Sequence, residues 1–221
     1  TNLMSQNIVY FDLETKKSAA DVGGWNHIDQ MGMSIGVTYS TERGGYKVYG
    51  EPEVEELIQE LQRADLVVGF NHIRFDYKVL EGYSVFDFSQ VPSLDMLIVL
   101  NEKLGHRLKL DSIAQATFGC EKTAEGLQAI EWYRQGKLAE IAEYCLFDVK
   151  ITKMVHEYGT AYSYLYYTNK FGNKLKFGIN DLIKQFSLSE ALELVGYDPY
   201  SILMFPNSDE IEGRIRRTYF M

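Results

Sequence analysis

Hydrophobic and polar positions follow a strand-like pattern in the first part of this chain. The apolar run at residues 8–13 predicts a buried strand. Residues 31–39 and 46–49 alternate in polarity around a glycine-containing turn, which predicts an antiparallel hairpin. Residues 66–70 are apolar throughout, as is typical of a strand buried on both faces of a sheet. We therefore expect a sheet built from these segments.

Between and after these strands, apolar residues recur at the spacing of amphipathic helices. This spacing predicts helices that begin near Pro52 and that span residues 75–82, 110–119, 127–134 and 137–158. Residues 91–99 predict a short strand, or a switch from strand to helix, around Asp95. The alternation of strands and helices favours an α/β domain whose mixed sheet is flanked by helices.

The pattern changes after Gly159, where tyrosines gather and a Phe171-Gly-Asn173 turn predicts a second hairpin. Residues 181–195 follow as an expected helix, with Gly196 as its stop. We therefore expect a main domain over residues 1–160. Residues 161–221 would form a C-terminal extension, made of the hairpin, the helix and a tail, that packs on it.

Composition limits the class of protein without identifying its activity. The chain has 221 residues, 46% of them hydrophobic, and two cysteines, which are too few for a disulfide framework. No apolar run of about 18 residues and no signal peptide is present, so we expect a cytoplasmic protein with no membrane partner. The net charge of −9 argues against a protein that coats nucleic acid. It does not argue against a metal-dependent nuclease, because bound divalent cations reverse the local field.

Two carboxylates close the first predicted strand. Asp12 and Glu14 are two residues apart on an extended backbone, so their side chains point to the same face. Adjacent carboxylates on a rigid strand are unfavourable unless a cation neutralises them. The simplest alternative is a strand end with solvated acids, and further acids at the same place would decide between the two.

The rest of the chain supplies two further acids. Asp76 begins a helix directly after a buried strand, which places it at the edge of the sheet where α/β proteins build their sites. Asp148 lies on the apolar face of the long predicted helix, with Tyr144 one turn before it. Four convergent carboxylates favour hard divalent cations such as Mg²⁺ or Mn²⁺. Two such ions about 4 Å apart would stabilise the attacking and leaving oxygens of a phosphodiester, and the hydroxyl of Tyr144 would orient the attacking water.

Three segments resemble the motifs of the DEDD superfamily of 3′–5′ exonucleases, which have a ribonuclease H-like fold. They are Phe11-Asp-Leu-Glu-Thr15, Asn71-His-Ile-Arg-Phe-Asp76 and Tyr144-Cys-Leu-Phe-Asp148, in the order of the family. The third resembles the DEDDy branch, which includes the proofreading domains of family A and B DNA polymerases. The histidine branch would have His where this chain has Glu143.

The resemblance implies an activity and a set of site residues. Asp12, Glu14, Asp76 and Asp148 would carry two divalent cations, Mg²⁺ or Mn²⁺, and Tyr144 would complete the catalytic group. Leu13, Thr15, Asn71 and Phe75 would contact the substrate. The expected reaction is hydrolysis at the 3′ end of single-stranded DNA or RNA, with DNA favoured, which releases nucleoside 5′-monophosphates. A helicase or polymerase is the expected protein partner.

Two other functions stay open at this point. One is a catalytically silent nucleic-acid-binding or scaffolding module of the same fold, and the other is an endonuclease or junction resolvase. The tyrosines at residues 162–167 could stack bases, although packing of the hairpin is the simpler interpretation. Asp95 and Asp111 are expected to cap helices, and His27, His106 and His156 are expected at the surface. Several basic residues could meet phosphates: Lys103, Arg107, Lys109, Arg214, Arg216 and Arg217.

Overall fold

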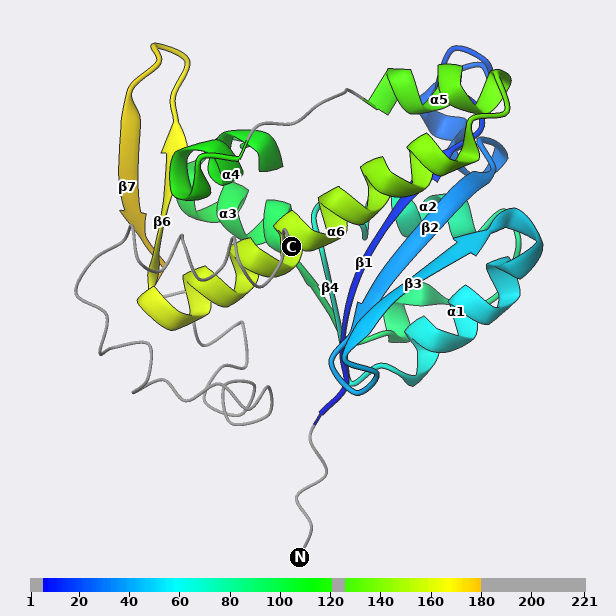
Figure 1. Cartoon of the computed structure of the whole chain (residues 1–221), viewed down its shortest axis with the longest axis horizontal. Helices are drawn as coiled ribbons and strands as arrows, with labels where there is room; N and C mark the ends of the chain where they lie inside the picture. The colour runs from blue at the N-terminus through cyan, green and yellow to red at the C-terminus, as the bar shows by residue number, and fades with distance from the viewer. Residues whose placement is uncertain (1–5, 121–125, 180–221) are drawn as a thin grey trace, which may run out of the picture.

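A five-stranded mixed sheet forms the centre of the computed structural model, which describes residues 6–120 and 126–179 (Figure 1). Its strand order is β3-β2-β1-β4-β5. β2 pairs with β1 and β3 in antiparallel orientation, whereas β4 is parallel to both β1 and β5. This arrangement confirms the expected mixed α/β sheet. The strands are β1 (Ile8–Thr15), β2 (Met33–Ser40), β3 (Gly45–Gly50), β4 (Leu66–Gly69) and β5 (Ser93–Asp95).

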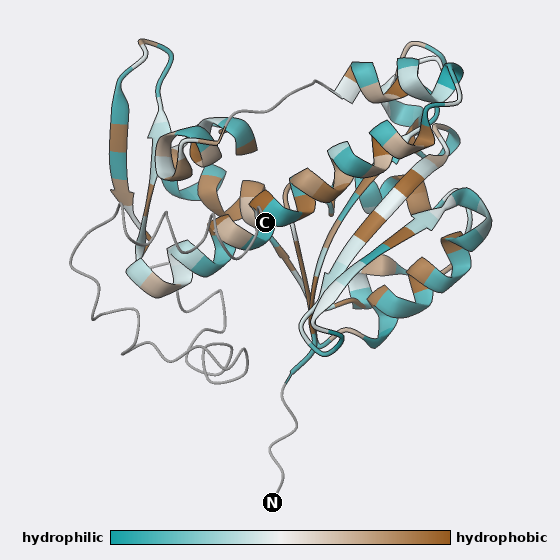
Figure 2. Ribbon diagram, viewed as in Figure 1, coloured by the Kyte–Doolittle hydropathy of each residue, from teal (hydrophilic) through white to brown (hydrophobic). Residues whose placement is uncertain are grey.

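The central strand β1 separates two hydrophobic clusters because its side chains alternate between the two faces of the sheet. Ile8 and Tyr10 pack in the cluster that includes α6 (Leu138–Tyr162). Val9, Phe11 and Leu13 pack in the other cluster, with α1 (Val54–Arg63) and α2 (Asp76–Leu80). Figure 1 shows α6 crossing one face of the sheet, and Figure 2 shows hydrophobic positions recurring along the mostly hydrophilic α1, as its burial of Leu57, Ile58 and Leu61 requires.

The remaining α-helices are short and extend the cluster around α6. They are α3 (Met96–Leu104), α4 (Leu110–Phe118) and α5 (Gly126–Arg134). Short 3-10 helices lie at Trp25–Gln30, Glu51–Glu53 and Phe88–Gln90, and Phe88 packs in the opposite cluster. The expected switch at Asp95 is confirmed, since β5 ends there and Asp95 caps α3 by accepting the N–H of Leu97. The expected cap at Asp111 is wrong. Lys109 precedes α4 and Asp111 lies in its first turn, because the helix begins at Leu110.

The second hairpin is also confirmed, as β6 (Tyr164–Thr168) paired with β7 (Lys174–Gly178). It lies against α4 and the end of α6, at one side of the molecule (Figure 1). The expected helix at residues 181–195 and the three arginines near the C-terminus lie outside the described residues. The division into a main domain and an extension stays a prediction. Within the described ranges, no helix is both long and apolar enough to cross a membrane.

One histidine is placed differently from the expectation. His156 is 3% exposed, whereas His27 and His106 are exposed as expected. His156 follows Thr152 by one helical turn, so it shares the face of α6 that packs on the sheet. Its Nδ1 lies 2.8 Å from the hydroxyl of Tyr10, which gives the buried ring a polar partner. Burial lowers the pKa of His156 to about 3, and the nearby charge of Lys153 acts in the same direction.

Candidate active site

The carboxylates of Asp12 and Glu14 lie on the face of β1 that α6 covers. Their side chains point to the same face of β1 as those of Ile8 and Tyr10. Both acids are half-buried, whereas their neighbours along the strand are buried. Because the side-chain period of a strand is two, the apolar packing of the first half of β1 fixes the direction of both acids in the second half. The strand therefore presents two acids to the helix above it.

Helix α6 presents the third acid. Asp148 is only 8% exposed, and it shares the buried side of α6 with Tyr144 and Cys145. One carboxylate oxygen from each of Asp12, Glu14 and Asp148 can be chosen so that all three lie within 4.8 Å of one another. Three carboxylates this close form a site whose charge a bound cation would neutralise. The convergence that the sequence predicts for these three residues is therefore present.

Asp76 lies beside this group but is not one of the three, and its side chain is tied to the backbone of β1. The parallel pairing of β1 with β4 runs only from Ile8 to Tyr10, so the later N–H groups of β1 have no partner in β4. The Oδ1 of Asp76 accepts a hydrogen bond from the N–H of Leu13 at 3.0 Å. Asp76 thus satisfies a backbone group at the point where the ladder stops.

Burial is the main cause of a raised pKa at Asp76, which reaches about 7. The hydrogen bond from Leu13 acts in the opposite direction, and the negative charges of Asp95 and Asp148 raise the pKa further. The interaction with Asp148 shows that Asp76 faces the acidic group. A carboxylate destabilised by burial and by like charges is one that a nearby cation would favour strongly in its ionised form.

Asp95 holds the turn that leads to Asp76. Its Oδ1 accepts the N–H of Asn71 at 2.8 Å and its Oδ2 accepts the N–H of Ile73 at 3.1 Å. Asn71 has a φ of 69°, in the left-handed region that few residues other than glycine adopt. A Cβ at Gly69 would lie 2.5 Å from the Nδ1 of His72, so only glycine allows the buried histidine to fold back under this turn. The turn is therefore tightly constrained.

Cys145 lies beside the acids of this site, which supply its possible metal ligands. Its Sγ lies 3.6 Å from the Oδ2 of Asp12, and its side chain is fully buried. Burial, followed by the negative charges of Asp12 and Glu14, raises the pKa of the thiol well above its usual value. The donors offered are carboxylate oxygens, which suit hard cations such as Mg²⁺ and Mn²⁺.

The four residues expected to contact substrate lie around this site in different environments. Leu13 is 3% exposed and packs on the opposite side of the sheet, so its backbone is the part nearest to the acids. Thr15 is buried, and its hydroxyl donates to the carbonyl of Lys17. Asn71 and Phe75 are half-buried. Their roles toward substrate stay predictions.

Two features near the site were not predicted from the sequence. The ring of Trp25 lies 6.4 Å from that of Phe75, and Trp25 is 69% exposed, so an aromatic surface borders the second motif. Its loop has no periodic pattern that could have indicated this position. The bracing role of Asp95 was also missed. Its place at the end of a predicted strand was a signal, but the pairing of β5 with β4 was needed to bring it to Asn71.

Comparison with known proteins agrees with this geometry. A family model described as the RNase_H superfamily matches residues 9–160. No curated protein matches the chain. Among solved structures, the family B DNA polymerase from the hyperthermophilic archaeon Pyrobaculum calidifontis is similar, with a TM-score of 0.55 and 14% sequence identity. That likeness covers 71% of this chain but only 25% of the polymerase chain, so it concerns one part of the polymerase.

The polymerase comparison shows a shared fold. The family match includes all three motifs and covers well over half of the 221 residues. The chain belongs to the RNase H superfamily.

Proposed function

We propose that the chain is a metal-dependent 3′–5′ exonuclease that acts on single-stranded nucleic acid and prefers DNA to RNA. Membership of the RNase H superfamily supports a nuclease-type activity. The observation that carries the finer proposal is the grouping of Asp12, Glu14 and Asp148 within 4.8 Å. Together with Asp76 and Tyr144, it matches the acids and the tyrosine of the DEDDy motifs. The products would be nucleoside 5′-monophosphates.

The residues would divide the chemistry among them. Two Mg²⁺ or Mn²⁺ ions, when bound, would supply an activated water and stabilise the departing 3′ oxygen. Asp12, Glu14 and Asp148 would hold them, with Asp76 completing the set from the neighbouring turn. Tyr144, on the same face of α6, would orient the attacking water through its hydroxyl group. A phenol with an ordinary pKa near 10 is almost wholly protonated at neutral pH, so it lacks the phenolate form that could remove the proton itself.

The preference for DNA and the protein partner rest on the comparison with a solved structure. That similar structure is a family B DNA polymerase, which favours DNA as substrate and a polymerase or helicase as partner. The chain spans a quarter of that polymerase, so a module that works with other proteins or domains is the arrangement we propose.

A time course on 5′-labelled single-stranded DNA and on RNA of the same sequence, in Mn²⁺, tests the activity and the choice of sugar. We expect a ladder that shortens from the 3′ end, faster on DNA. Asp12→Asn should abolish it, whereas the matched control Glu55→Gln, an exposed acid on α1, should not. A circular single strand should stay intact. Cleavage of the circle would indicate an endonuclease, and tight binding without cleavage of any strand would indicate a silent binding module.

A further inference from the structure

The β6–β7 hairpin has two chemically different faces. Cross-strand pairing puts Leu165 opposite Phe177, and both are buried against the core. On the other face, Tyr166 pairs with Lys176. Tyr164 lies two residues before Tyr166, so its side chain points to the same face. The Nζ of Lys176 lies 3.7 Å from the centre of the Tyr164 ring. The Nζ of Lys174 lies 4.5 Å from that of Tyr166. Tyrosine rings and lysines therefore share the outward face.

Helix α4 holds this hairpin in place through its hydroxyl groups. Ser112 donates to the carbonyl of Thr168 at 3.0 Å and accepts its N–H at 3.1 Å. Thr117 makes the same pair of bonds with Tyr166, both at 3.2 Å. The free edge of β6 is thus satisfied as though another strand lay beside it. The outward tyrosines and lysines stand on a fixed support, which lowers the entropy lost when a ligand binds.

The charge of this region is opposite to that of the chain. The chain carries −9, yet it has no Asp or Glu between Glu157 and Asp181. Lys170, Lys174 and Lys176 fall in this interval, and all three are exposed. An anionic polymer would therefore meet positive charge on the hairpin.

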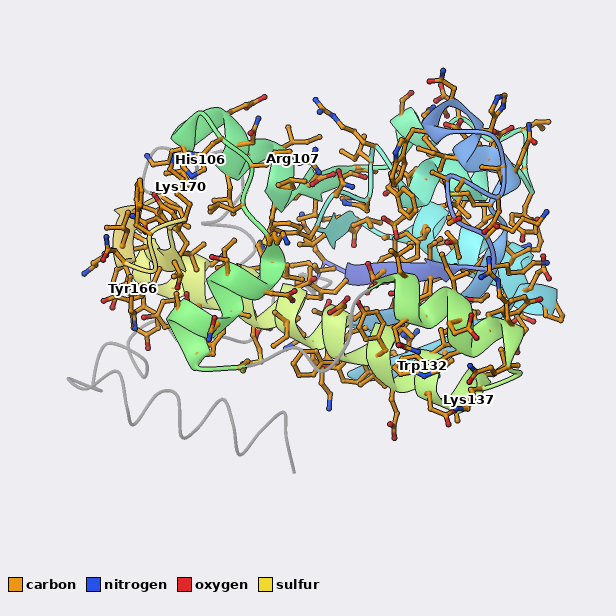
Figure 3. The ribbon with its side chains drawn as sticks, turned by 90° about the horizontal axis from the view of Figure 1, so that it is seen from above. His106, Arg107, Trp132, Lys137, Tyr166 and Lys170 are labelled. Atoms are coloured by element: carbon orange, nitrogen blue, oxygen red, sulfur yellow. The ribbon has the colours of Figure 1, made fainter. Side chains whose placement is uncertain are left out.

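The loop between α3 and α4 lies against the buried face of the hairpin, on which Tyr167 packs with Phe177. The ring of His106 lies 5.8 Å from that of Tyr167, which places this loop against the hairpin. Arg107 follows His106 and is exposed. Figure 3 shows His106, Lys170 and Tyr166 toward one end of the molecule, Arg107 nearer its middle, and Trp132 and Lys137 toward the other end.

Helix α3 and the loop that follows it connect the hairpin with the acidic site. The helix begins after Asp95, which holds the Asn71 turn, and it ends at Leu104, two residues before His106. Nine helical residues span about 13 Å. Stacked nucleotides rise about 3.4 Å each, so about four nucleotides would cover the length of α3.

We propose that the outward face of the β6–β7 hairpin binds single-stranded nucleic acid several nucleotides upstream of its 3′ end. This rests on the proposed function, because it assigns the 3′ end to the acidic site. The lysines would neutralise phosphates. Tyr164 and Tyr166 would stack bases once the lysines move from their rings to phosphates. Lysines on an edge strand can also discourage strand pairing, so the test measures binding rather than solubility.

The experiment compares a K174A/K176A variant with a K47A/K78A control, which removes two lysines elsewhere, the half-buried Lys47 and the exposed Lys78. Fluorescence anisotropy with a labelled 12-nucleotide DNA, in EDTA, reports binding without turnover. We expect about tenfold weaker binding for the hairpin variant only. The slope of log K against log salt should fall by about 1.4, which corresponds to two phosphate contacts. In Mn²⁺, KM for the 12-mer should rise with kcat unchanged, while hydrolysis of a dinucleotide should be unaffected.

The outcomes separate this proposal from the proposed function. Unchanged affinity and salt slope in the hairpin variant would overturn the binding surface, whatever the activity. An equal loss of DNA affinity in both double variants would also overturn the binding surface, because the loss would then not depend on which two lysines are removed. A wild-type protein that binds DNA but never cleaves it would contradict the exonuclease, and the EDTA binding data would still decide the role of the hairpin.

Discussion

The Oδ1 of Asp76 accepts a hydrogen bond from the backbone N–H of Leu13 at 3.0 Å, and this bond joins the second motif to the first. It forms where the parallel pairing of β1 with β4 ends, at Tyr10 and Val68. One carboxylate therefore completes the backbone of the strand that bears Asp12 and Glu14, and also faces Asp148. Asp76 has a structural role and a proposed catalytic role that different substitutions can separate.

Replacing Asp76 by Asn should abolish nuclease activity but leave the fold stable. The amide oxygen can still accept the N–H of Leu13, whereas the charge needed near a cation is lost. Asp76→Ala should also lose activity, and it should lower the free energy of unfolding by about 1–3 kcal/mol because a buried N–H is left without an acceptor. Urea unfolding of both variants, beside the activity assay, checks this. Equal destabilisation by Asn and Ala would show that the bond to Leu13 contributes little.

Tyr144→Phe should slow hydrolysis by up to about 10²-fold without weakening Mn²⁺ binding. Loss of the hydroxyl removes the proposed contact with the attacking water, and misplaced reactants lose rate on this scale. The phenyl ring should keep its packing beside Trp132, whose ring lies 6.2 Å away. Single-turnover rates and Mn²⁺ calorimetry measure the two properties. A variant that unfolds or fails to bind Mn²⁺ would assign Tyr144 to the core instead.

Asp95→Asn should lower both stability and turnover, although Asp95 is not one of the proposed metal ligands. Its two oxygens accept N–H groups from Asn71 and Ile73, and an amide offers only one oxygen. We expect a loss of about 1–3 kcal/mol from the unpaired N–H, with a reduced kcat as the Asn71 turn shifts. Asp87→Asn is the matched control, since Asp87 caps an exposed 3-10 helix. If the two substitutions have equal effects on kcat, Asp95 does not position the turn.

His156 should make the protein less stable as the pH falls from about 6.5 toward 3. Its pKa is lowered to about 3 by burial and by Lys153, so the unfolded chain takes up a proton that the folded protein does not. The contribution of His156 to the free energy of unfolding is then complete above the pKa that His156 has in the unfolded chain. It decreases below that pKa, by up to about 1.4 kcal/mol per pH unit. Unfolding by urea at pH 7.5 and 5.0 measures the slope. His156→Gln, whose side chain can still form a hydrogen bond with Tyr10, should reduce this dependence of stability on pH. An unchanged slope would show that His156 is not its cause.

Periodicity was sufficient to predict the central geometry of the site. The two-residue period of β1 placed Asp12 and Glu14 on one face, and the helical period placed Tyr144 and Asp148 on the buried side of α6. Both follow from local backbone geometry, which a sequence encodes directly.

Tertiary relations were not predictable in this way. The bond from Leu13 to Asp76 depends on where β4 ends, and the contact of Asn71 with Asp95 depends on the pairing of β4 with β5. His156 was misplaced because a polar residue was assigned to the surface, although the hydroxyl of Tyr10 supplies its partner across the sheet. Each of these three relations involves a partner far away in the sequence, whereas the error at Asp111 concerned only where its own helix begins.

The most direct test of the account is the rate of nucleotide release from a 3′-labelled single strand, measured against Mn²⁺ concentration. Wild type, Asp148→Asn and Glu143→Gln are compared, because the two substitutions each remove one negative charge from α6 and only Asp148 faces the acidic group. We predict saturable, Mn²⁺-dependent release by wild type and Glu143→Gln, with none by Asp148→Asn. Release by Asp148→Asn at the wild-type rate, or release that persists in EDTA, would contradict a metal-dependent exonuclease centred on these carboxylates.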